Sequence, residues 1–238
     1  MRYRTEATSV EGFVQQLVSN YLAAGYWFYV TGHVPEPKDP RAVDRKLVER
    51  YGIDLSRPVR SKRKAQGLAN IHLLRFGRFF VLVSTHGRHA FFRDEASSIR
   101  DIRSIPIQFQ GYSISVKRGD YLQRAEGESS AAADGRYRVR VQIARAQYRE
   151  FKAYLLERAR YPAEVLGRDF FTLPFEPYAP VRRQLLMLLS LVNQARKAAG
   201  ETPLPYSVLR YRRRIVRPFE PIVLDEPTGL KAASQSAA

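Results

Sequence analysis

Residues 136–141 read Arg-Tyr-Arg-Val-Arg-Val. Side chains alternate between the two faces of a β-strand, so this period predicts a strand with one apolar and one basic face. Tyr137, Val139 and Val141 would then face a core, and the three arginines Arg136, Arg138 and Arg140 would point outward together, with Gln142 extending their row. The expected strand 112–116 alternates in the same way, and half-exposed strands of this kind are typical of antiparallel sheets.

Three like charges on one strand face repel each other, and an anion lying across them would offset that repulsion. A guanidinium group suits phosphate because its planar fork donates two parallel hydrogen bonds. The alternative is an edge strand whose charges prevent aggregation. Edge protection usually uses Lys and needs only one or two charges, so three arginines favour phosphate contact.

The composition of the whole chain points the same way. Its 238 residues hold 40 Lys and Arg against 23 Asp and Glu, a formal net charge of +17, and nucleic acid is the commonest polyanionic partner. The absence of cysteine excludes disulfides and thiol sites, and it fits a reducing cytoplasm. The apolar run at 185–192 is far shorter than the roughly 20 residues that span a bilayer, and no signal peptide is expected. We therefore expect a cytoplasmic protein that does not bind membranes.

Outward from the arginine strand, the sequence predicts an α+β fold with a mainly antiparallel sheet. A capping box of Thr8 and Glu11 begins a helix that ends at Gly25. A strand at 26–30 and a helix from Asp39-Pro40 to Gly52 complete a helix-strand-helix opening. The further expected strands are 71–76, 79–84, 107–109, 112–116 and 207–216, with 90–92 as a continuation of the sheet, and two helices, 145–158 and 181–199, are expected in the C-terminal half.

The chain is predicted to form one nucleic-acid-binding domain over residues 1–224. Two halves, 1–120 and 136–224, are the alternative, because the small and polar residues 126–135 are typical of a flexible loop. Residues 225–238 lack aromatic side chains and are expected to be a disordered tail.

Further basic segments are candidate contacts for nucleic acid. Residues 57–64 have no carboxylate and are predicted to be a solvated loop or arm, which would add affinity with little sequence information. Its candidate residues are Arg57, Arg60, Lys62, Arg63 and Lys64. The expected strand 207–216 mixes tyrosine with arginine, a combination that suits stacked, unpaired bases, and its candidates are Arg210, Arg212, Arg213 and Arg214.

Arg182 and Arg183 stand near the start of the last long helix, where the helix dipole disfavours cations. A bound phosphate would reverse that penalty and would also satisfy the unpaired backbone N–H groups. Pairing of these arginines with nearby Glu176 is the alternative explanation.

Catalysis is weakly indicated, and no cofactor or metal site is predicted. The histidines His33, His72, His86 and His89 are scattered, and no Walker loop, H-E-x-x-H or G-x-S-x-G motif occurs. The element order from Val30 to residue 84 distantly resembles that of metal-dependent tyrosine nickases and transposases, for which Tyr148 would be the nucleophile. The His-hydrophobic-His triplet of that class is absent, so its catalytic residues are not carried over.

Nucleic-acid binding in replication, transposition or repair, with DNA and RNA both open, is therefore the primary hypothesis. A single-strand nickase related to mobile elements and a basic scaffold that docks on an acidic protein are the alternatives.

Overall fold

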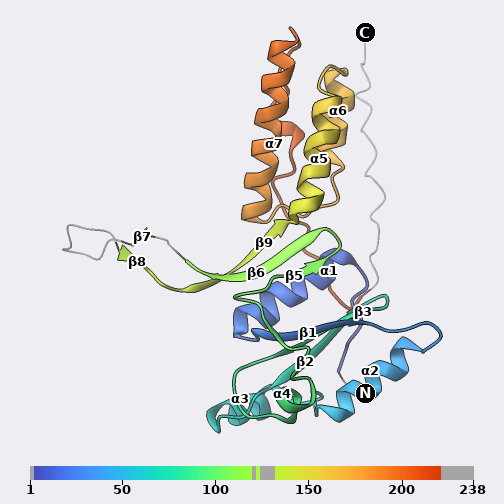
Figure 1. The fold of residues 1–238 in the computed structure, drawn as a ribbon, viewed down its shortest axis with the longest axis vertical. Coiled ribbons are helices and arrows are strands. Elements are labelled where there is room, and N and C mark those ends of the chain that lie inside the picture. Colours follow the sequence, from blue (N-terminus) through green and yellow to red (C-terminus); the bar gives the residue numbers. More distant parts are fainter. Residues whose placement is uncertain (1–2, 120–121, 124–131, 221–238) are drawn as a thin grey trace, which may run out of the picture.

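The computed structural model describes residues 3–119, 122–123 and 132–220, which form an α+β fold with antiparallel sheets (Figure 1). The α-helices are α1 Val10–Gln15, α2 Pro40–Arg50, α3 Arg57–Ala65, α4 Ala90–Asp94, α5 Arg145–Glu157, α6 Ala163–Phe171 and α7 Ala179–Ala198. The strands are β1 Phe28–His33, β2 Ile71–Phe76, β3 Phe79–Ser84, β4 Arg100–Asp101, β5 Ile107–Phe109, β6 Tyr112–Arg118, β7 Leu122–Gln123, β8 Ala132–Ala133 and β9 Tyr137–Ile143.

The first helix is capped by Ser9 and not, as expected, by Thr8. The Ser9 hydroxyl accepts a hydrogen bond from the Gly12 N–H at 3.0 Å, while the Thr8 hydroxyl donates to the carbonyl of Glu220 at 2.5 Å. Beyond α1 the helix continues as a π-helical stretch, η1 Gln16–Tyr21, and a 3₁₀ turn, η2 Leu22–Ala24. Gly25 then ends it at φ 90°, as the sequence predicts.

A four-stranded sheet in the order β2-β3-β1-β4 follows. The β2–β3 hairpin turns at Gly77, and its strands have the predicted bounds. Residues 90–92, in contrast, do not continue the sheet. They begin α4, because the His89 Nδ1 accepts a hydrogen bond from the Phe91 N–H at 3.0 Å and caps a helix there.

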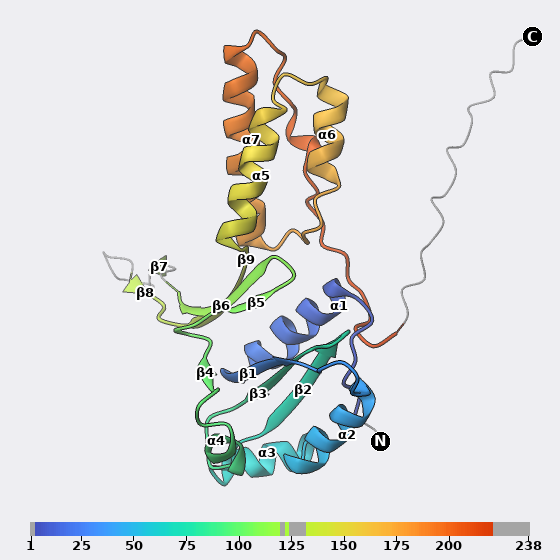
Figure 2. The ribbon, with the colours of Figure 1, turned by 45° about the vertical axis from the view of Figure 1, so that its right-hand side comes forward.

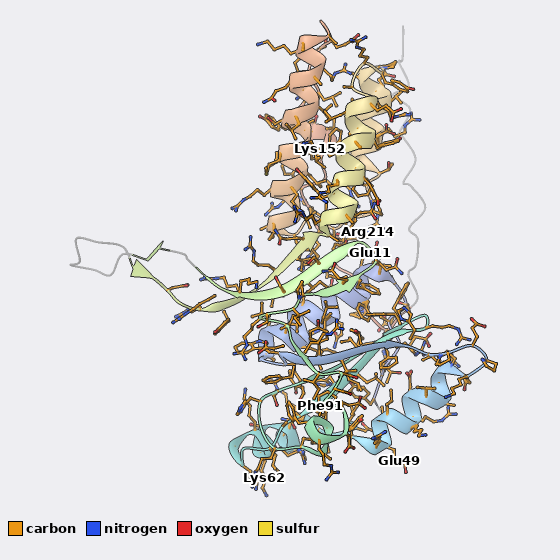
Figure 3. The ribbon with its side chains drawn as sticks, viewed as in Figure 1. Glu11, Glu49, Lys62, Phe91, Lys152 and Arg214 are labelled. Carbon is orange, nitrogen blue, oxygen red and sulfur yellow. The ribbon has the colours of Figure 1, made fainter. Side chains whose placement is uncertain are left out.

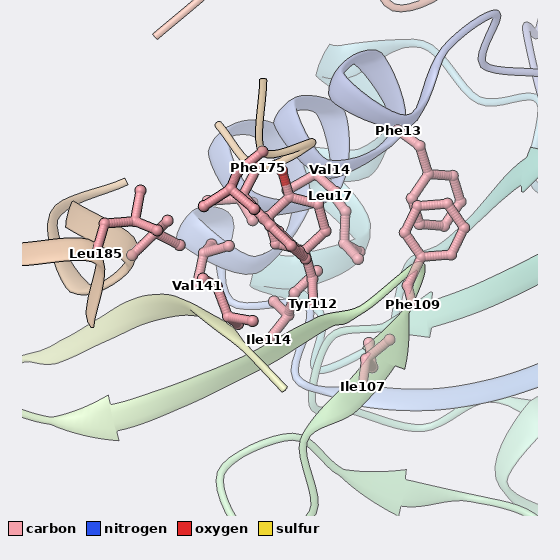
Figure 4. Packing of buried hydrophobic residues seen from close by; sticks show 14 of the residues in the cluster. Phe13, Val14, Leu17, Ile107, Phe109, Tyr112, Ile114, Val141, Phe175 and Leu185 are labelled. Atoms are coloured by element: carbon pink, nitrogen blue, oxygen red, sulfur yellow. The ribbon is translucent and has the colours of Figure 1, made fainter. Parts of the chain in front are cut away.

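Both faces of this sheet are buried, which explains why β2 and β3 are apolar at consecutive positions. One face packs on α2 and α4 through a cluster that includes Leu73, Leu82 and Phe91. The other face joins a larger core in which Phe13 and Leu17 of the first helix lie between the two sheets (Figure 4). That larger core extends from Ala7 to Leu209 and includes all of the long helices of the second half of the chain.

The second sheet has the order β5-β6-β9, and its outer part leaves the body of the molecule as a two-stranded ribbon (Figures 1 and 2). Tyr112, Ile114 and Val141 are buried at the root of the ribbon. The short pair β7–β8 lies near its tip. Residues 126–131 of the expected flexible loop lie outside the described residues, and Ala132–Ala133 form β8.

Helices α5 and α7 have the predicted positions, and α6 is an additional helix in the Pro-containing connection between them. The prediction for the chain after α7 was wrong. The segment expected to be a strand, 207–216, is instead a 3₁₀ turn, η3 Tyr206–Val208, followed by irregular chain. Side chains replace a strand partner there: the Gln15 amide bonds both the N–H (3.3 Å) and the C=O (2.8 Å) of Val216.

The α+β class, the antiparallel sheets and the N-terminal helix-strand-helix are thus confirmed. The expected disordered tail, 225–238, lies outside the described residues. Within the described part of the chain, no helix is both long enough and apolar enough to cross a membrane.

Candidate nucleic-acid interface

The β6–β9 ribbon carries the predicted arginine row on its outer face. In its register Arg138 lies opposite Lys117 and Arg140 opposite Ser115, so basic and small polar side chains share that face. Arg136 and Arg140 are exposed, and neither has an ion-pair partner among the residues that the structure describes. Arg136 just precedes the strand, although its carbonyl still accepts a hydrogen bond from the Gly119 N–H at 2.7 Å.

Arg138 differs from its two neighbours because it is half-buried and ion-paired. Its guanidinium group donates to both carboxylate oxygens of Asp134, at 3.0 Å for the Nη1–Oδ1 pair. This contact lowers the pKa of Asp134 and neutralises part of the row. The sequence pattern missed it because the ion pair depends on the turn that precedes the strand.

Tyr137 was expected to face the core, but its side chain is 45% exposed. The body covers the apolar face of β9 less and less toward this end of the strand: Val141 is buried, Val139 is partly buried against the core, and Tyr137 is exposed. Tyr137 packs instead against Trp27, with ring centroids 4.9 Å apart, and lies 5.7 Å from the Arg103 guanidinium carbon. The sequence pattern placed Trp27 in the expected strand 26–30 and gave Arg103 no role.

The basic segment 57–64 is a helix, α3, and not the predicted loop or arm. Pro58 stands in its first turn, where proline favours helix formation, and its Lys and Arg residues are good helix formers. Arg60 turns inward and donates to the carbonyls of Leu55 at 3.1 Å, Ile71 at 3.0 Å and Ile53. The repulsion between like charges is reduced because this guanidinium leaves the solvated face.

The remaining cations of α3 are of two kinds, one partly buried like Arg60 and the others exposed. Arg63 is half-buried and donates to the Ala69 carbonyl at 3.1 Å, whereas Arg57, Lys62 and Lys64 are exposed. Figure 3 shows Lys62 on the outer side of α3, at the end of the molecule remote from α5–α7. Three of the five predicted residues of this segment are therefore accessible to an anion, and two mainly hold the helix in place.

Two adjoining recesses border α3, and the first of them lies toward the root of the ribbon. The first has a volume of 320 Å³ and is lined by side chains that include Trp27, Phe28, His86 and Arg103. The second, of 730 Å³, is lined by Arg57, Arg60, the tyrosines Tyr3, Tyr21 and Tyr26, and others. Lys64 and Thr85 line both recesses, so the two form one continuous surface of aromatic and cationic groups.

The last basic group surrounds the start of α7. Arg182 and Arg183 are exposed there, and Arg213 stacks 4.7 Å from the ring of Tyr178. Glu176 is buried and does not pair with Arg182 or Arg183; it lies 3.6 Å from Arg210 and accepts the backbone N–H of Arg214 at 2.6 Å.

Arg210 also donates to the carbonyls of Leu173 and Phe175, so it fastens the C-terminal segment to the helices. Arg212, Arg213 and Arg214 remain exposed, and Figure 3 shows Arg214 near the lower end of α5, close to Glu11 of α1. This group of cations lies on irregular chain and not on the expected strand.

The histidines do not converge. His72 is enclosed by Tyr21 (ring centroids 4.2 Å apart) and Tyr26, and burial lowers its pKa to about 3. His89 caps α4, whereas His86 is exposed. No group of three or more His, Asp or Glu side chains that could hold a metal ion occurs among the described residues.

Tyr148, the nucleophile of the nickase hypothesis, is half-buried against the main core. That burial raises the pKa of its hydroxyl, which makes the tyrosinate nucleophile harder to form. Nothing in its surroundings favours the nickase hypothesis.

No protein-family model matches the sequence, and no curated protein matches it as a relative.

Proposed function

We propose that this protein binds DNA and contacts the duplex through the β6–β9 ribbon. One observation carries the proposal: the ribbon projects from the body and bears exposed cations on both strands or at their ends, namely Lys117, Arg118, Arg136 and Arg140 (Figure 2). Lys117 and Arg118 also donate to the carbonyls of Arg103 (2.8 Å) and Gly135 (3.1 Å). Arg136 and Arg140, in contrast, have no ion-pair partner among the described residues. Contact with the phosphates of DNA would account for these exposed charges.

The shape of the ribbon favours DNA over RNA. The major groove of B-form DNA admits a two-stranded β-ribbon, whereas the major groove of A-form RNA is deep and narrow. Arg136 and Arg140 project from one face of the ribbon, as residues two or four apart on a strand do. Such a row would follow a line of phosphates and fix the register of the protein on the duplex without reading the bases.

The net charge of +17 supports the same function at longer range, because it would steer the protein toward a polyanion. The exposed cations of α3 and of the α7 start would add contacts on either side of the ribbon. The proposal includes the cytoplasmic location expected from the sequence.

The test is a double substitution of the ribbon, Arg136→Gln with Arg140→Gln, followed by titration of a labelled duplex across a series of salt concentrations. Both side chains are exposed, so the variant should fold normally. Affinity should fall roughly a hundredfold or more, because two charged hydrogen bonds to phosphate are lost and each contributes about 1.5–3 kcal/mol. The slope of log K against log salt should become shallower by about 0.9 for each phosphate that is no longer neutralised.

The matched control removes the same charge elsewhere. Arg45 and Lys46 are exposed on α2, on the side of the molecule opposite the ribbon (Figures 1 and 2). Arg45→Gln with Lys46→Gln should change affinity and slope much less. Equal losses in both variants would reduce the effect to net charge and contradict the proposal. Tight binding to an acidic protein with no affinity for DNA would favour the scaffold hypothesis instead.

A further inference from the structure

The recess at the root of the ribbon combines flat, partly exposed groups that the fold holds still. The Trp27 Nε1 donates to the Leu22 carbonyl at 3.1 Å, which fixes the indole. Arg103 is clamped by Asp101 through Nε at 3.0 Å and Nη2 at 2.6 Å. Its guanidinium carbon lies 4.9 Å from the Trp27 ring. A preorganised stack of this kind presents indole and guanidinium surface to the recess without further ordering cost.

The recess is connected to the ribbon by direct contacts. Tyr137 of β9 packs on Trp27, and the Lys117 Nζ donates to the Arg103 carbonyl at 2.8 Å. On its other side the recess is bordered by Lys64 of α3. A nucleic-acid strand that leaves the ribbon would therefore meet the Trp27 recess next and the exposed cations of α3 after it.

We propose that this recess takes one unpaired DNA base, stacked against Trp27 and Arg103, from a strand that continues out of a duplex. The inference rests on the proposed function, because the ribbon supplies the duplex contact. Its volume of 320 Å³ is at the lower end of the range for small-molecule sites, which suits a single base. Aromatic and guanidinium faces are the groups on which proteins stack unpaired bases.

Stacking tolerates any base, so this contact would confer a preference for structure and not for sequence. The preferred substrate is then a duplex with a single-stranded extension. A blunt duplex would contact the ribbon but leave the recess empty.

The tryptophan itself reports the contact, because Trp27 is the only tryptophan in the chain. The experiment compares three DNAs in a titration of intrinsic fluorescence: a blunt duplex, the same duplex with an overhang, and that overhang with an abasic first nucleotide. The last two carry the same phosphates and differ only by one base. The intact overhang should quench Trp27 and bind about tenfold tighter than the abasic one.

A protein variant gives a second readout. Trp27→Leu keeps an apolar side chain but removes the indole, and the control Phe171→Leu changes an aromatic residue that is 55% exposed on α6. Anisotropy should show that Trp27→Leu binds the intact and abasic overhangs equally, while Phe171→Leu still distinguishes them. If Trp27→Leu fails to fold, the comparison of the two overhangs on the unmodified protein still decides.

The outcomes separate this inference from the proposed function. Binding of all three DNAs with equal affinity and no quenching would overturn the recess proposal and leave the ribbon proposal standing. No binding of any of them would overturn the proposed function, and the recess proposal with it.

Discussion

Arg60 and Arg136 have the same side chain and opposite surroundings. Arg60 donates to three backbone carbonyls and holds α3 against the sheet, whereas Arg136 lies exposed beside the ribbon. Both lie in arginine-rich stretches of the sequence, so local composition does not distinguish the buried arginine from the exposed one. The distinction depends on the carbonyls of Ile53 and Ile71, which only the tertiary fold brings to α3. Sequence patterns therefore identified candidate cations but could not tell which of them are exposed.

His72 gives a prediction at this scale, because it is enclosed by tyrosine rings and lies near the positive charge of Arg60. Burial first, and then Arg60, lower its pKa from 6.5 to about 3. Between these values the unfolded chain binds a proton that the folded protein does not, so stability rises with pH there. The free energy of unfolding should fall as pH drops from 6.5 toward 4, by at most about 1.4 kcal/mol per pH unit from this group.

The measurement is urea unfolding across that pH range for the wild type and His72→Phe, which keeps a ring to stack on Tyr21. The variant should show a flatter pH dependence than the wild type. Substitution of the exposed His86 by Ala serves as the control and should leave the pH dependence of the free energy of unfolding as it is in the wild type. Parallel curves for the wild type and His72→Phe would show that His72 titrates normally.

At the scale of elements, local signals predicted the segments whose structure is decided locally. The β2–β3 hairpin, α2 and α7 have turn or cap residues at their ends, and their predicted bounds are close to the observed ones. Two predictions were wrong for different reasons. Segment 57–64 was predicted to be a loop from its charge, although Pro58 and its Lys and Arg residues favour a helix, and Arg60 anchors that helix through buried carbonyls. Segment 207–216 gained side-chain partners such as Gln15 in place of a neighbouring strand.

The anchoring of α3 is testable. Arg60→Met removes the hydrogen bonds to Leu55, Ile71 and Ile53 and leaves their carbonyls without this donor. The free energy of unfolding should fall by about 1–3 kcal/mol. Lys62→Met on the same helix removes an equal charge from an exposed position and should cost less than about 0.5 kcal/mol. Equal effects in chemical denaturation would show that Arg60 carries no structural role.

At the scale of the whole molecule, exposed cations form three groups. One lies on the ribbon, and the other two lie on either side of it, on α3 and at the start of α7 with residues 212–214. The sequence predicted all three as candidate sites, but it could not predict that the ribbon would project or that the Trp27 recess would lie at its root. Those features arise from the packing of β9 against α7 and of Tyr137 against Trp27, contacts between residues far apart in the chain.

The most direct test of the ribbon interface needs no variant. Arginines of the wild-type protein are modified with phenylglyoxal in the presence and absence of duplex DNA, and each site is quantified by mass spectrometry. Because phosphate contact would cover their guanidinium groups, Arg136 and Arg140 should be strongly protected by DNA, while Arg45 on the opposite side should react equally in both samples. Unchanged modification of Arg136 and Arg140 under conditions where the DNA is bound would contradict the proposed ribbon interface.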